Sequence, residues 1–549
     1  MFEKVLVKKP KRARFDFSHG NTLSMQFGRL TPTEMRFIVP GDDVSVSMEQ
    51  IVRLAPLPVP TFVNMKVRHD WFFVPLSMMY NQESMDLLFS QNPGSYQRAH
   101  VRNMSDYVQL FTGMPTTYGD FDQLEPFVAG SLHDYFNLPV FTDVNMYDFG
   151  AGNLNPDWVT FQTTPTSANY TTLRSNTKVK QVTDALPGPI LEPLLGFHYI
   201  WRDWYQFTGM DSVYGTTYNS WLENHVFNKN FLTKAVQYTT GYINWSDFGV
   251  DSSYMHTARP QIGSSLCGTK YVYFKKDMFN SVRYGNKPQV LIPTGASGTI
   301  PNLRQASALQ KFIDIIAVAG ARYWDKVKAL WNETPTGMKC ERAQFLGRYM
   351  AFIKVGEVIT TANTTQGNTG DYAGRGLLVD GRYIFKRHFT EHGWLFCVSS
   401  IVPEMAYNGY DRQLTDWNIL DTPIPSFANI GDQSVINREI RVMYDNTYDN
   451  TSSFGDQFRY YAYKSDVNRI HGDFLMDSFR AWTALLPENQ YVTMDPRAFG
   501  LVDPIVWNKI FAFTVNANRQ PFFNGRFFLD LTFHEFITRN LPKYVSYAL

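Results

Sequence analysis

An alternation of apolar and polar residues near both ends of the chain predicts β-strands. Apolar side chains occupy almost every second position from Val63 to Val74, and a shorter alternation from Val44 to Glu49 follows the turn-forming residues Pro40 to Asp42. The same period of two returns from Phe527 to His534. Because successive side chains of a strand point to opposite faces, each segment is expected to bury one face and leave the other near solvent.

Two other patterns predict a buried strand and helices. Trp394 to Val402 is almost wholly apolar, which is typical of a strand covered on both faces. A helical period begins at Asn302, where a Gln three residues later suggests a capping box, and continues to Ile316. Gly320 is expected to kink or end this helix before Tyr323 to Leu330 resumes the period, and Leu194 to Phe207 is a second helical candidate.

The stretches between these segments are long and rich in Gly, Pro, Asn, Thr and Tyr, which is typical of loops. A length of 549 residues would by itself suggest about three or four compact units. Strong strands near both termini favour instead one β-sandwich whose inter-strand connections have become very long. The lack of a fixed-period repeat disfavours propellers and solenoids.

Aromatic residues are unusually abundant, since 43 Phe, 31 Tyr and 12 Trp make up 16% of the chain. Such a surplus fits extensive subunit contacts, carbohydrate binding or stacking on nucleic-acid bases, and composition does not choose among them. Lys and Arg number 51 and Asp and Glu 50, so the formal charge is only +1. Contact with a polyanion must therefore be local, and weak self-repulsion permits dense self-association.

Cysteine usage and hydropathy exclude several other classes. Cys267, Cys340 and Cys397 lie far apart without a CxxC pair, so neither a disulfide framework nor a zinc site is expected, and the thiols are predicted to be reduced and buried. The N-terminus lacks the apolar stretch of a secretory signal. The apolar segment Phe312 to Ala321 is too short to span a bilayer and contains Asp314, so no membrane insertion is expected.

Local motifs that resemble catalytic or phosphate-binding sites each lack a defining residue. Gly367 to Gly376 has the glycines of a phosphate cradle without the Lys and Ser or Thr of a P-loop, so a surface loop is expected. His534-Glu535 has Thr538 where a zinc protease needs its second His, and adjacent strand residues point to opposite faces. This pair and Glu391-His392 are expected to form structural hydrogen bonds.

An oxygen-rich segment raises the question of calcium. It contains Asp445, Asn446, Asp449 and Asn450. It lacks the central Gly and terminal Glu of an EF-hand loop, so a plain turn is favoured over a Ca²⁺ site. No catalytic, cofactor-binding or metal-binding residue is therefore predicted.

Several strings in a fixed order resemble the major capsid proteins of the microviruses, which are small single-stranded-DNA bacteriophages, and in particular the gokushovirus branch. The resemblance begins with FDFSHGNTLSMQFGRL at Phe15 and covers nearly the whole chain. The other strings are RLAPLPVP at Arg53 to Pro60, HDWFFVP from His69, GFHYIWRDWYQ at 196 to 206, LRQASALQKF from Leu303, TTQGNTGDYAGRG at 364 to 376, EHGW from Glu391, PSFANIGDQSVINREI at Pro425 to Ile440 and FGDQFRYYAYKSDVNRIHGDF at Phe454 to Phe474. One string alone is weak, but chance agreement of several in order is improbable.

The resemblance implies an all-β fold, namely an eight-stranded antiparallel jelly-roll β-sandwich with very long inter-strand insertions that contain a few helices. Residues 15–549 are then expected to form a single jelly-roll domain. It also implies a non-enzymatic protein that forms pentamers and a T=1 icosahedral shell around a circular single-stranded DNA genome. The implied location is the virion, after assembly in the cytoplasm of a bacterial host.

The resemblance also implies partners. Besides further copies of the chain and packaged DNA, these are an internal scaffolding protein, a DNA pilot protein, a small basic DNA-packaging protein and a receptor on the host cell surface. No cofactor is implied. A formal charge of only +1 per subunit fits, since a near-neutral shell leaves much of the charge of the genome to other cations.

Residues 1–14 are expected to form a flexible basic arm that faces the capsid interior. Lys and Arg side chains can neutralise DNA phosphates whatever the base sequence, in an interaction that is sensitive to salt, and this suits contact with packaged DNA. A solvated tail is the alternative. The residues predicted to contact DNA are Lys8, Lys9, Lys11, Arg12 and Arg14. A handful of aromatic rings on the inner surface could also stack on unpaired bases.

One departure from the family pattern concerns the exposed surface. Gokushovirus capsid proteins usually carry a long insertion before the LRQ-containing helix that builds a protrusion at the threefold axes, but the corresponding stretch, Ile292 to Asn302, is short. Residues 207–268 are longer than expected, so they are the candidate surface-exposed insertion, and membership of a neighbouring branch stays open. The aromatic residues predicted to be exposed there are Trp221, Tyr238, Tyr242 and Trp245.

Two other functions stay open at this point. A carbohydrate-active β-sandwich enzyme would account for the Trp and Tyr content, but it would need two carboxylates that converge in a cleft, and no motif nominates such a pair. A monomeric single-stranded nucleic-acid-binding protein would show salt-dependent DNA affinity without forming shells. The size of the assembled particle distinguishes all three functions.

Overall fold

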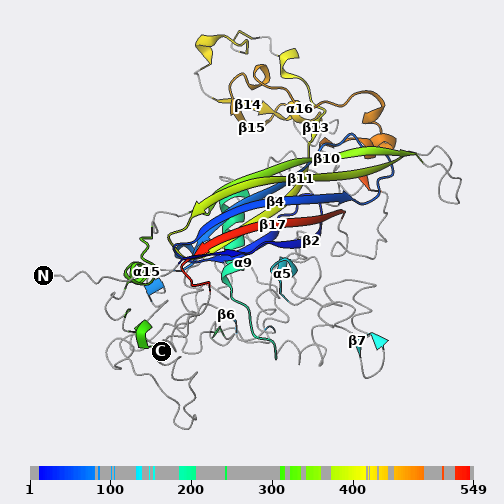
Figure 1. The fold of residues 1–549 in the computed structure, drawn as a ribbon. Coiled ribbons are helices and arrows are strands. Elements are labelled where there is room, and N and C mark those ends of the chain that lie inside the picture. Colours follow the sequence, from blue (N-terminus) through cyan, green and yellow to red (C-terminus); the bar gives the residue numbers. More distant parts are fainter. Residues whose placement is uncertain are drawn as a thin grey trace, which may run out of the picture.

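The described part of the chain is a curled β-sheet with helical insertions, as the computed structural model shows (Figure 1). The structure describes residues 12–80, 185–205, 322–335, 342–359, 372–415, 421–428, 432–442, 450–486 and 526–543, and the short pieces 85–86, 100–101, 104, 132–138, 147–148, 153–154, 242–243, 310–313, 315, 418–419 and 510–511. Strands from both ends of the chain lie side by side in the sheet, because the last strand, β17, pairs with β1, β2 and β4.

Nine strands form this sheet in the order β1-β17-β4-β11-β10-β5-β12-β3, with β2 also pairing with β17. Every pairing is antiparallel. The bounds are β1 Ala13–Asp16, β2 His19–Met25, β3 Thr31–Ile38, β4 Asp43–Leu54, β5 Met65–Pro75, β10 Gln344–Ile359, β11 Tyr372–His388, β12 Gly393–Pro403 and β17 Phe527–Arg539. Because β1 and β2 pair with successive parts of β17, the nine strands fill eight positions.

The eight positions divide into two sheets of a jelly roll. Sheet A consists of β1 and β2, β17, β4 and β11, and sheet B of β10, β5, β12 and β3. The long strand β10 links them, because its first part pairs with β5 and its last six residues, Lys354 to Ile359, pair with β11. Successive strands mostly alternate between the sheets, as two Greek keys require, so the predicted all-β jelly-roll class is confirmed.

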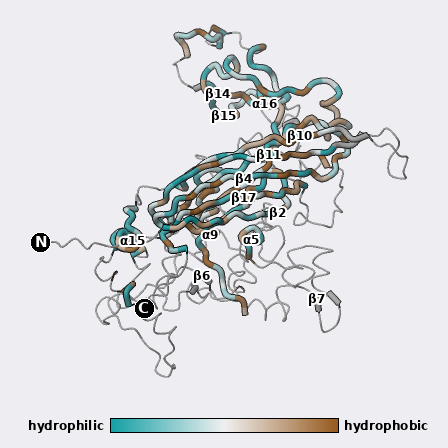
Figure 2. Tube along the Cα trace, viewed as in Figure 1, coloured by the Kyte–Doolittle hydropathy of each residue, from teal (hydrophilic) through white to brown (hydrophobic). Residues whose placement is uncertain are grey.

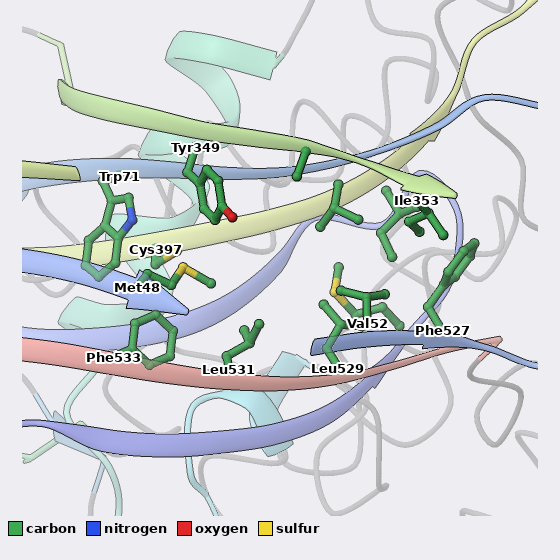
Figure 3. Close-up of a cluster of buried hydrophobic side chains, with 14 of the residues drawn as sticks. Met48, Val52, Trp71, Tyr349, Ile353, Cys397, Phe527, Leu529, Leu531 and Phe533 are labelled. Carbon is green, nitrogen blue, oxygen red and sulfur yellow. The ribbon is translucent and has the colours of Figure 1, made fainter. Parts of the chain in front are cut away.

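The hydrophobic core lies between the inward faces of sheets A and B. Figure 3 shows Met48 and Val52 of β4 facing side chains of sheet B that include Cys397 and Trp71. The Trp71 ring makes edge contacts with Phe533, at 5.9 Å between centroids, and with Phe385 of β11. Burial of these large apolar side chains is the main term that stabilises the sandwich.

Helical insertions cover part of the outer face of sheet B, over β12, β3 and the end of β5. They are α1 Leu76–Met79, α9 Glu192–Ile200, the π-helical turn η2 Trp201–Tyr205 and α15 Tyr323–Trp331. Their side chains form a second apolar cluster with Phe72 and Val74 of β5 and Phe396 and Val398 of β12. Helix α9 lies so close to β12 that a Cβ at Gly196 would stand 2.7 Å from the Phe396 ring, so this contact requires glycine.

Shorter elements complete the described part of the fold. They are α5 Leu132–Tyr135, β6 His100–Val101, β7 Tyr147–Asp148, β8 Asn153–Leu154, β9 Tyr242–Ile243, β13 Ala406–Tyr407, β14 Asp432–Ile436, α16 Asn437–Ile440, β15 Ser453–Phe458, β16 Leu485–Leu486, and the 3₁₀ turns η5 Arg412–Leu414, η6 Pro425–Phe427, η7 Tyr461–Tyr463, η8 Gly472–Leu475 and η9 Asp477–Trp482. Figure 1 shows β14, β15 and α16 beyond the β10 side of the sheet. The strands among them pair as β6 with β9, β7 with β8, β13 with β16 and β14 with β15.

Most predictions of secondary structure are confirmed. The alternating segments Val44 to Glu49 and Phe527 to His534 lie in β4 and β17, the segment from Val63 is strand from Met65 onward as β5, and the wholly apolar segment is β12. The candidate at Leu194 to Phe207 is helical through Tyr205 as α9 and η2, and the resumed period is α15. Residues 310–313 and 315 are helical, whereas Gly320 lies outside the described residues. Among the helices that the structure describes, none is long and apolar enough to cross a membrane.

The prediction of a surface loop at Gly367 to Gly376 is wrong for its second half. Tyr372 to Gly376 are the first residues of β11 and pair with the end of β10. Gly376 suits this strand because it lies close to the neighbouring strand β4, where a Cβ at this position would be 2.5 Å from the Leu54 side chain. Residues 367–371 lie outside the described residues.

Candidate assembly surface and polar clusters

The outer face of sheet A exposes apolar side chains on three adjacent strands. Ile51 of β4 is 38% exposed, Leu377 and Val379 of β11 are 40% and 66% exposed, and Phe528 of β17 is 50% exposed. Figure 2 shows hydrophilic and hydrophobic positions in alternation along β4 and β17. An exposed apolar patch of this kind is a candidate surface for contact with another protein.

Strand register arranges this outer face in mixed rows. Ile51 lies opposite Val379 on one side and Asp530 on the other, so apolar side chains and an acid share a row across three strands. A groove of about 540 Å³ follows the same strands and is lined by residues that include Glu49 and His534. The outer face of sheet A can therefore offer both apolar area and polar pairing to a partner.

Two residues of the predicted DNA-contacting arm lie at the edge of sheet A. The Arg12 guanidinium donates to Asp43 Oδ2 at 2.7 Å and to the Gly41 carbonyl at 2.5 Å. Arg14, on β1, places its guanidinium carbon 4.1 Å from the centroid of the Phe536 ring. The lysines predicted with them, Lys8, Lys9 and Lys11, lie outside the described residues. DNA contact by these five residues stays a prediction.

Other predicted surface residues are placed only in part. Trp221, Tyr238 and Trp245 lie outside the described residues, and Tyr242 begins the two-residue strand β9, which pairs with β6. Asp445, Asn446 and Asp449 of the oxygen-rich segment lie outside the described residues as well. Exposure of the four aromatic residues stays a prediction. Cys397 is buried and free, as predicted, whereas Cys267 and Cys340 lie outside the described residues.

A buried aspartate ties the helical insertion to sheet B. Asp70 of β5 accepts hydrogen bonds from Arg348 Nε at 2.5 Å, from Arg68 at 3.1 Å and from the Tyr205 hydroxyl at 2.8 Å. Burial and the charge of Asp70 raise the pKa of Tyr205. The two arginines also line a groove of about 400 Å³ on the outer face of sheet B.

A histidine lies in the core between the sheets and is fully buried. His69 of β5 has its Nδ1 2.6 Å from Ser399 Oγ and its Nε2 2.9 Å from Gln50 Oε1. Burial lowers the pKa of His69 to about 3. The ring is therefore neutral at pH 7, and both nitrogens have polar neighbours, as a buried polar group requires.

The predicted structural hydrogen bonds of the two acid–histidine pairs are observed for Glu391, His392 and Glu535. Glu391 and His392 are both buried, and their partners are Ser77 for the carboxylate and Tyr323 of α15 for the imidazole. In the other pair, His534 lies on the outer face of sheet A, whereas Glu535 points into the protein and is fully buried.

Glu535 belongs to a cluster of four charged or titratable residues. Arg36 of β3 donates from Nε to Glu535 Oε2 at 2.8 Å and from Nη2 to Glu34 Oε1 at 2.7 Å. His19 Nε2 lies 2.6 Å from Glu34 Oε2. The hydrogen bond with Glu34 raises the pKa of His19 to about 9. Burial, and then the charge of Glu34, raises the pKa of Glu535.

Sequence reasoning missed this cluster, although part of the signal is present. Glu535 follows Phe533 by two positions and precedes Ile537 by two, so the alternation of β17 places its carboxylate inward. A carboxylate at an inward position needs a cation or hydrogen-bond donors. Nothing in the sequence pattern identifies Arg36, 499 positions away, as the donor.

A family model described as capsid protein (F protein) matches residues 4–101 and 195–503, which is more than half of the chain. The chain belongs to this capsid protein family. Among similar proteins, capsid protein VP1 of Chlamydia phage 1 is 24% identical over 543 residues, with 86% of each chain covered. Capsid protein VP1 of Bdellovibrio phage phiMH2K is 22% identical over 515 residues, which cover 88% of this chain and 86% of the relative.

A shorter match agrees with these two. Capsid protein VP1 of Spiroplasma virus 4 is 28% identical over 189 residues, or 33% of this chain and 32% of the relative. The predicted microvirus-type major capsid protein is thus confirmed, with a structural role in the virion and self-assembly into a shell. Strand β17 lies beyond the end of the matched ranges but completes sheet A.

Proposed function

We propose that this capsid protein forms pentamers and closes into a T=1 icosahedral shell around a circular single-stranded DNA genome. The observation that supports this most is the exposed apolar area on the outside of the sandwich. It lies on β4, β11 and β17 of sheet A, and at Met350 and Phe352 of β10 on the part of sheet B that the helical layer leaves open. A rigid sandwich with apolar side chains on its outer faces can bury them against neighbouring copies. Several weak faces engaged at once make ring closure cooperative.

The proposal includes the partners expected of a microvirus-type capsid protein. An internal scaffolding protein guides assembly in the cytoplasm of the bacterial host, a DNA pilot protein and a small basic packaging protein accompany the genome, and exposed loops bind a receptor on the host cell. The formal charge of +1 per subunit supports a role for other cations in neutralising the DNA.

The proposal assigns no catalytic step to the chain. Glycoside hydrolysis would need two carboxylates across a cleft, whereas the buried carboxylates of Asp70 and Glu535 each form an ion pair with an arginine. These ion pairs support a structural interpretation of both acids.

Expression of the full chain, alone and with its scaffolding protein, tests the proposal through sedimentation and negative-stain microscopy. We expect pentamers or closed icosahedral particles of uniform size. A small oligomer that cleaves polysaccharides would support an enzyme instead. A monomer with tight, salt-dependent affinity for single-stranded DNA would support the nucleic-acid-binding alternative. Either result would contradict the proposed shell.

The DNA contact can be tested separately in particles. Replacement of Lys8, Lys9 and Lys11 by Gln is expected to lower the amount of packaged DNA, measured on purified particles as the ultraviolet absorbance of nucleic acid relative to that of protein. Arg12→Gln is tested apart from the lysines, because Arg12 also pairs with Asp43 and its replacement should in addition weaken the edge of sheet A. Unchanged DNA content in the lysine variant would remove the predicted contact.

A further inference from the structure

The His19 cluster lies where the curled sheet meets itself. His19 belongs to β2 at one end of the strand order, Glu34 to β3 at the other end, and Glu535 to β17. The two edges approach each other directly here, because Asn21 Nδ2 donates to the Thr33 carbonyl at 2.7 Å. A group bound between the three side chains would therefore connect sheets A and B across their seam.

The three side chains have the composition and spacing of a metal site. A ring nitrogen of His19 and one carboxylate oxygen from each glutamate lie within 4.8 Å of one another. His19 Nδ1 lies 3.0 Å from the Phe17 carbonyl, and the ring stacks on Phe533 at 5.2 Å between centroids. A backbone carbonyl on one ring nitrogen is the usual partner of a metal-binding histidine, and it leaves Nε2 for the ion.

Arg36 holds one oxygen of each carboxylate and leaves the other available. It donates to Glu34 Oε1 and to Glu535 Oε2, so Glu34 Oε2 and Glu535 Oε1 remain. Glu535 Oε1 has no hydrogen-bond partner among the described residues, and the residue is fully buried. A buried carboxylate oxygen without a donor is costly, and a cation bound within the cluster would satisfy it.

We propose that His19, Glu34 and Glu535 bind one divalent cation, with Zn²⁺ preferred, that joins β2, β3 and β17. One imidazole and two carboxylates suit zinc, whereas Ca²⁺ and Mg²⁺ prefer oxygen ligands alone. Water would complete a tetrahedral site. On binding, the ion takes the place of the proton that links His19 Nε2 to Glu34, and that proton is released to solvent.

Geometry and charge both permit the ion. Tetrahedral zinc with bonds of about 2.1 Å keeps its ligand atoms about 3.4 Å apart, so atoms within 4.8 Å of one another need shifts of only about an ångström. Glu34, Glu535 and Arg36 together carry a net charge of −1, which a divalent cation changes to +1. Arg36 then acts as a partner that orients both carboxylates.

Titration of the full chain with ZnCl₂, after treatment with EDTA, tests the site by calorimetry. We expect one Zn²⁺ per chain and little response to Mg²⁺ or Ca²⁺. The measured binding enthalpy should change linearly with the ionisation enthalpy of the buffer, because protons are released on binding. His19→Gln and Glu535→Gln should each weaken Zn²⁺ binding at least about 100-fold. Zinc should raise the Tm of the wild type but not that of either variant.

His388 provides a matched control on the surface. Its Nδ1 lies 2.6 Å from Asp43 and its Nε2 3.2 Å from Glu333, so the two acids face opposite ring nitrogens and cannot share one ion with it. His388→Gln should leave Zn²⁺ affinity unchanged. Equal zinc binding by wild type and His19→Gln, or loss of binding in His388→Gln alone, would overturn the proposal.

The wild-type chain gives a second measurement if a variant fails to fold. Co²⁺ in the site should produce the intense visible absorption of a tetrahedral complex, and one equivalent of Zn²⁺ should abolish it. An octahedral Co²⁺ spectrum, or no saturable spectrum, would contradict the site. Binding is measured on the subunit, so this result does not depend on whether the shell is T=1.

Discussion

The two sheets of the jelly roll share one core but differ on their outer faces. On sheet B, Phe72 and Phe396 point outward and are at most 1% exposed, because α9, η2 and α15 cover them. On sheet A, outward residues such as Val379 and Phe528 are 66% and 50% exposed. The helical layer thus covers β12, β3 and the end of β5. The outer face of sheet A is left for contacts with a partner, and so is the β10 side of sheet B, where Met350 and Phe352 are 43% and 46% exposed.

The sequence pattern of each sheet reflects this difference. Strand β12 is apolar at consecutive positions, as a strand covered on both faces must be, whereas β4 and β17 alternate. Apolar residues at outward positions of sheet A, such as Ile51 and Val379, break the alternation without gaining cover within the described part of the chain. Contact between subunits explains them better than stability of the isolated subunit.

The largest expected effect separates the two outer faces directly. Phe396→Ala should lower the free energy of unfolding of the subunit by about 3–5 kcal/mol, because the ring is fully buried between β12 and α9. Phe528→Ala on sheet A should change it by less than about 1 kcal/mol. Urea unfolding followed by tryptophan fluorescence measures both. Similar losses in the two variants would contradict the assignment of a covered and a free face.

A second effect concerns acid sensitivity of the covered side. Burial lowers the pKa of His198, in α9, to about 4. Because this folded-state pKa is below the unfolded value of about 6.5, the neutral ring stabilises the protein at pH 7, and this contribution is lost as the pH falls from about 6.5 to 4. The loss at pH 4 is expected to reach about 3 kcal/mol, since each pH unit is worth about 1.4 kcal/mol.

Urea unfolding at several pH values measures the contribution of His198. His198→Gln should reduce the slope of the unfolding free energy against pH by about 1.4 kcal/mol per unit between pH 6 and 4.5. An unchanged slope in His198→Gln would show that the side chain is already charged or hydrated in the folded protein.

The local sequence pattern predicts best the strands in which polar and apolar residues alternate strictly or in which polar residues are almost absent. The alternations in β4, β5 and β17 and the apolar run of β12 were sufficient because side-chain direction follows directly from strand geometry. Tyr372 to Gly376 were predicted as loop because their glycines are typical of turns, and only the pairing with β10 makes them strand. Pairing partners lie far apart in sequence, so the jelly-roll order came from the family resemblance and not from periodicity.

The polar clusters were less predictable than the strands. The inward direction of Glu535 follows from alternation, but its partners Arg36, Glu34 and His19 lie about 500 positions earlier and meet it only because the sheet curls. Asp70 occupies an outward position of β5 and would be expected in water, yet Tyr205 and the helical layer bury it. Long-range closure, which sequence periodicity does not encode, brings such groups together.

A smaller effect should arise where the covering layer touches sheet B most closely. Gly196→Ala places a methyl group 2.7 Å from the Phe396 ring and 3.1 Å from Met79, so these side chains must shift. Such overpacking is expected to cost about 1–3 kcal/mol of unfolding free energy. The double variant Gly196→Ala with Phe396→Leu should recover part of the loss, because Leu leaves room for the methyl group. Additive losses in a double-mutant cycle would contradict direct contact between α9 and β12.

Val379→Glu should have the smallest effect on the stability of the subunit and a clear effect on its assembly into particles. Val379→Glu lies on an exposed strand surface, so the unfolding free energy should change by about 0.5 kcal/mol or less. If sheet A packs against a neighbouring copy, the same change places an unpaired charge in an interface and should sharply reduce the sedimenting particle fraction. Leu414→Glu, at a position 81% exposed in η5, is the control for added charge. Normal particles from Val379→Glu would show that the outer face of sheet A stays free of subunit contacts, whereas equal loss in both variants would indicate general repulsion.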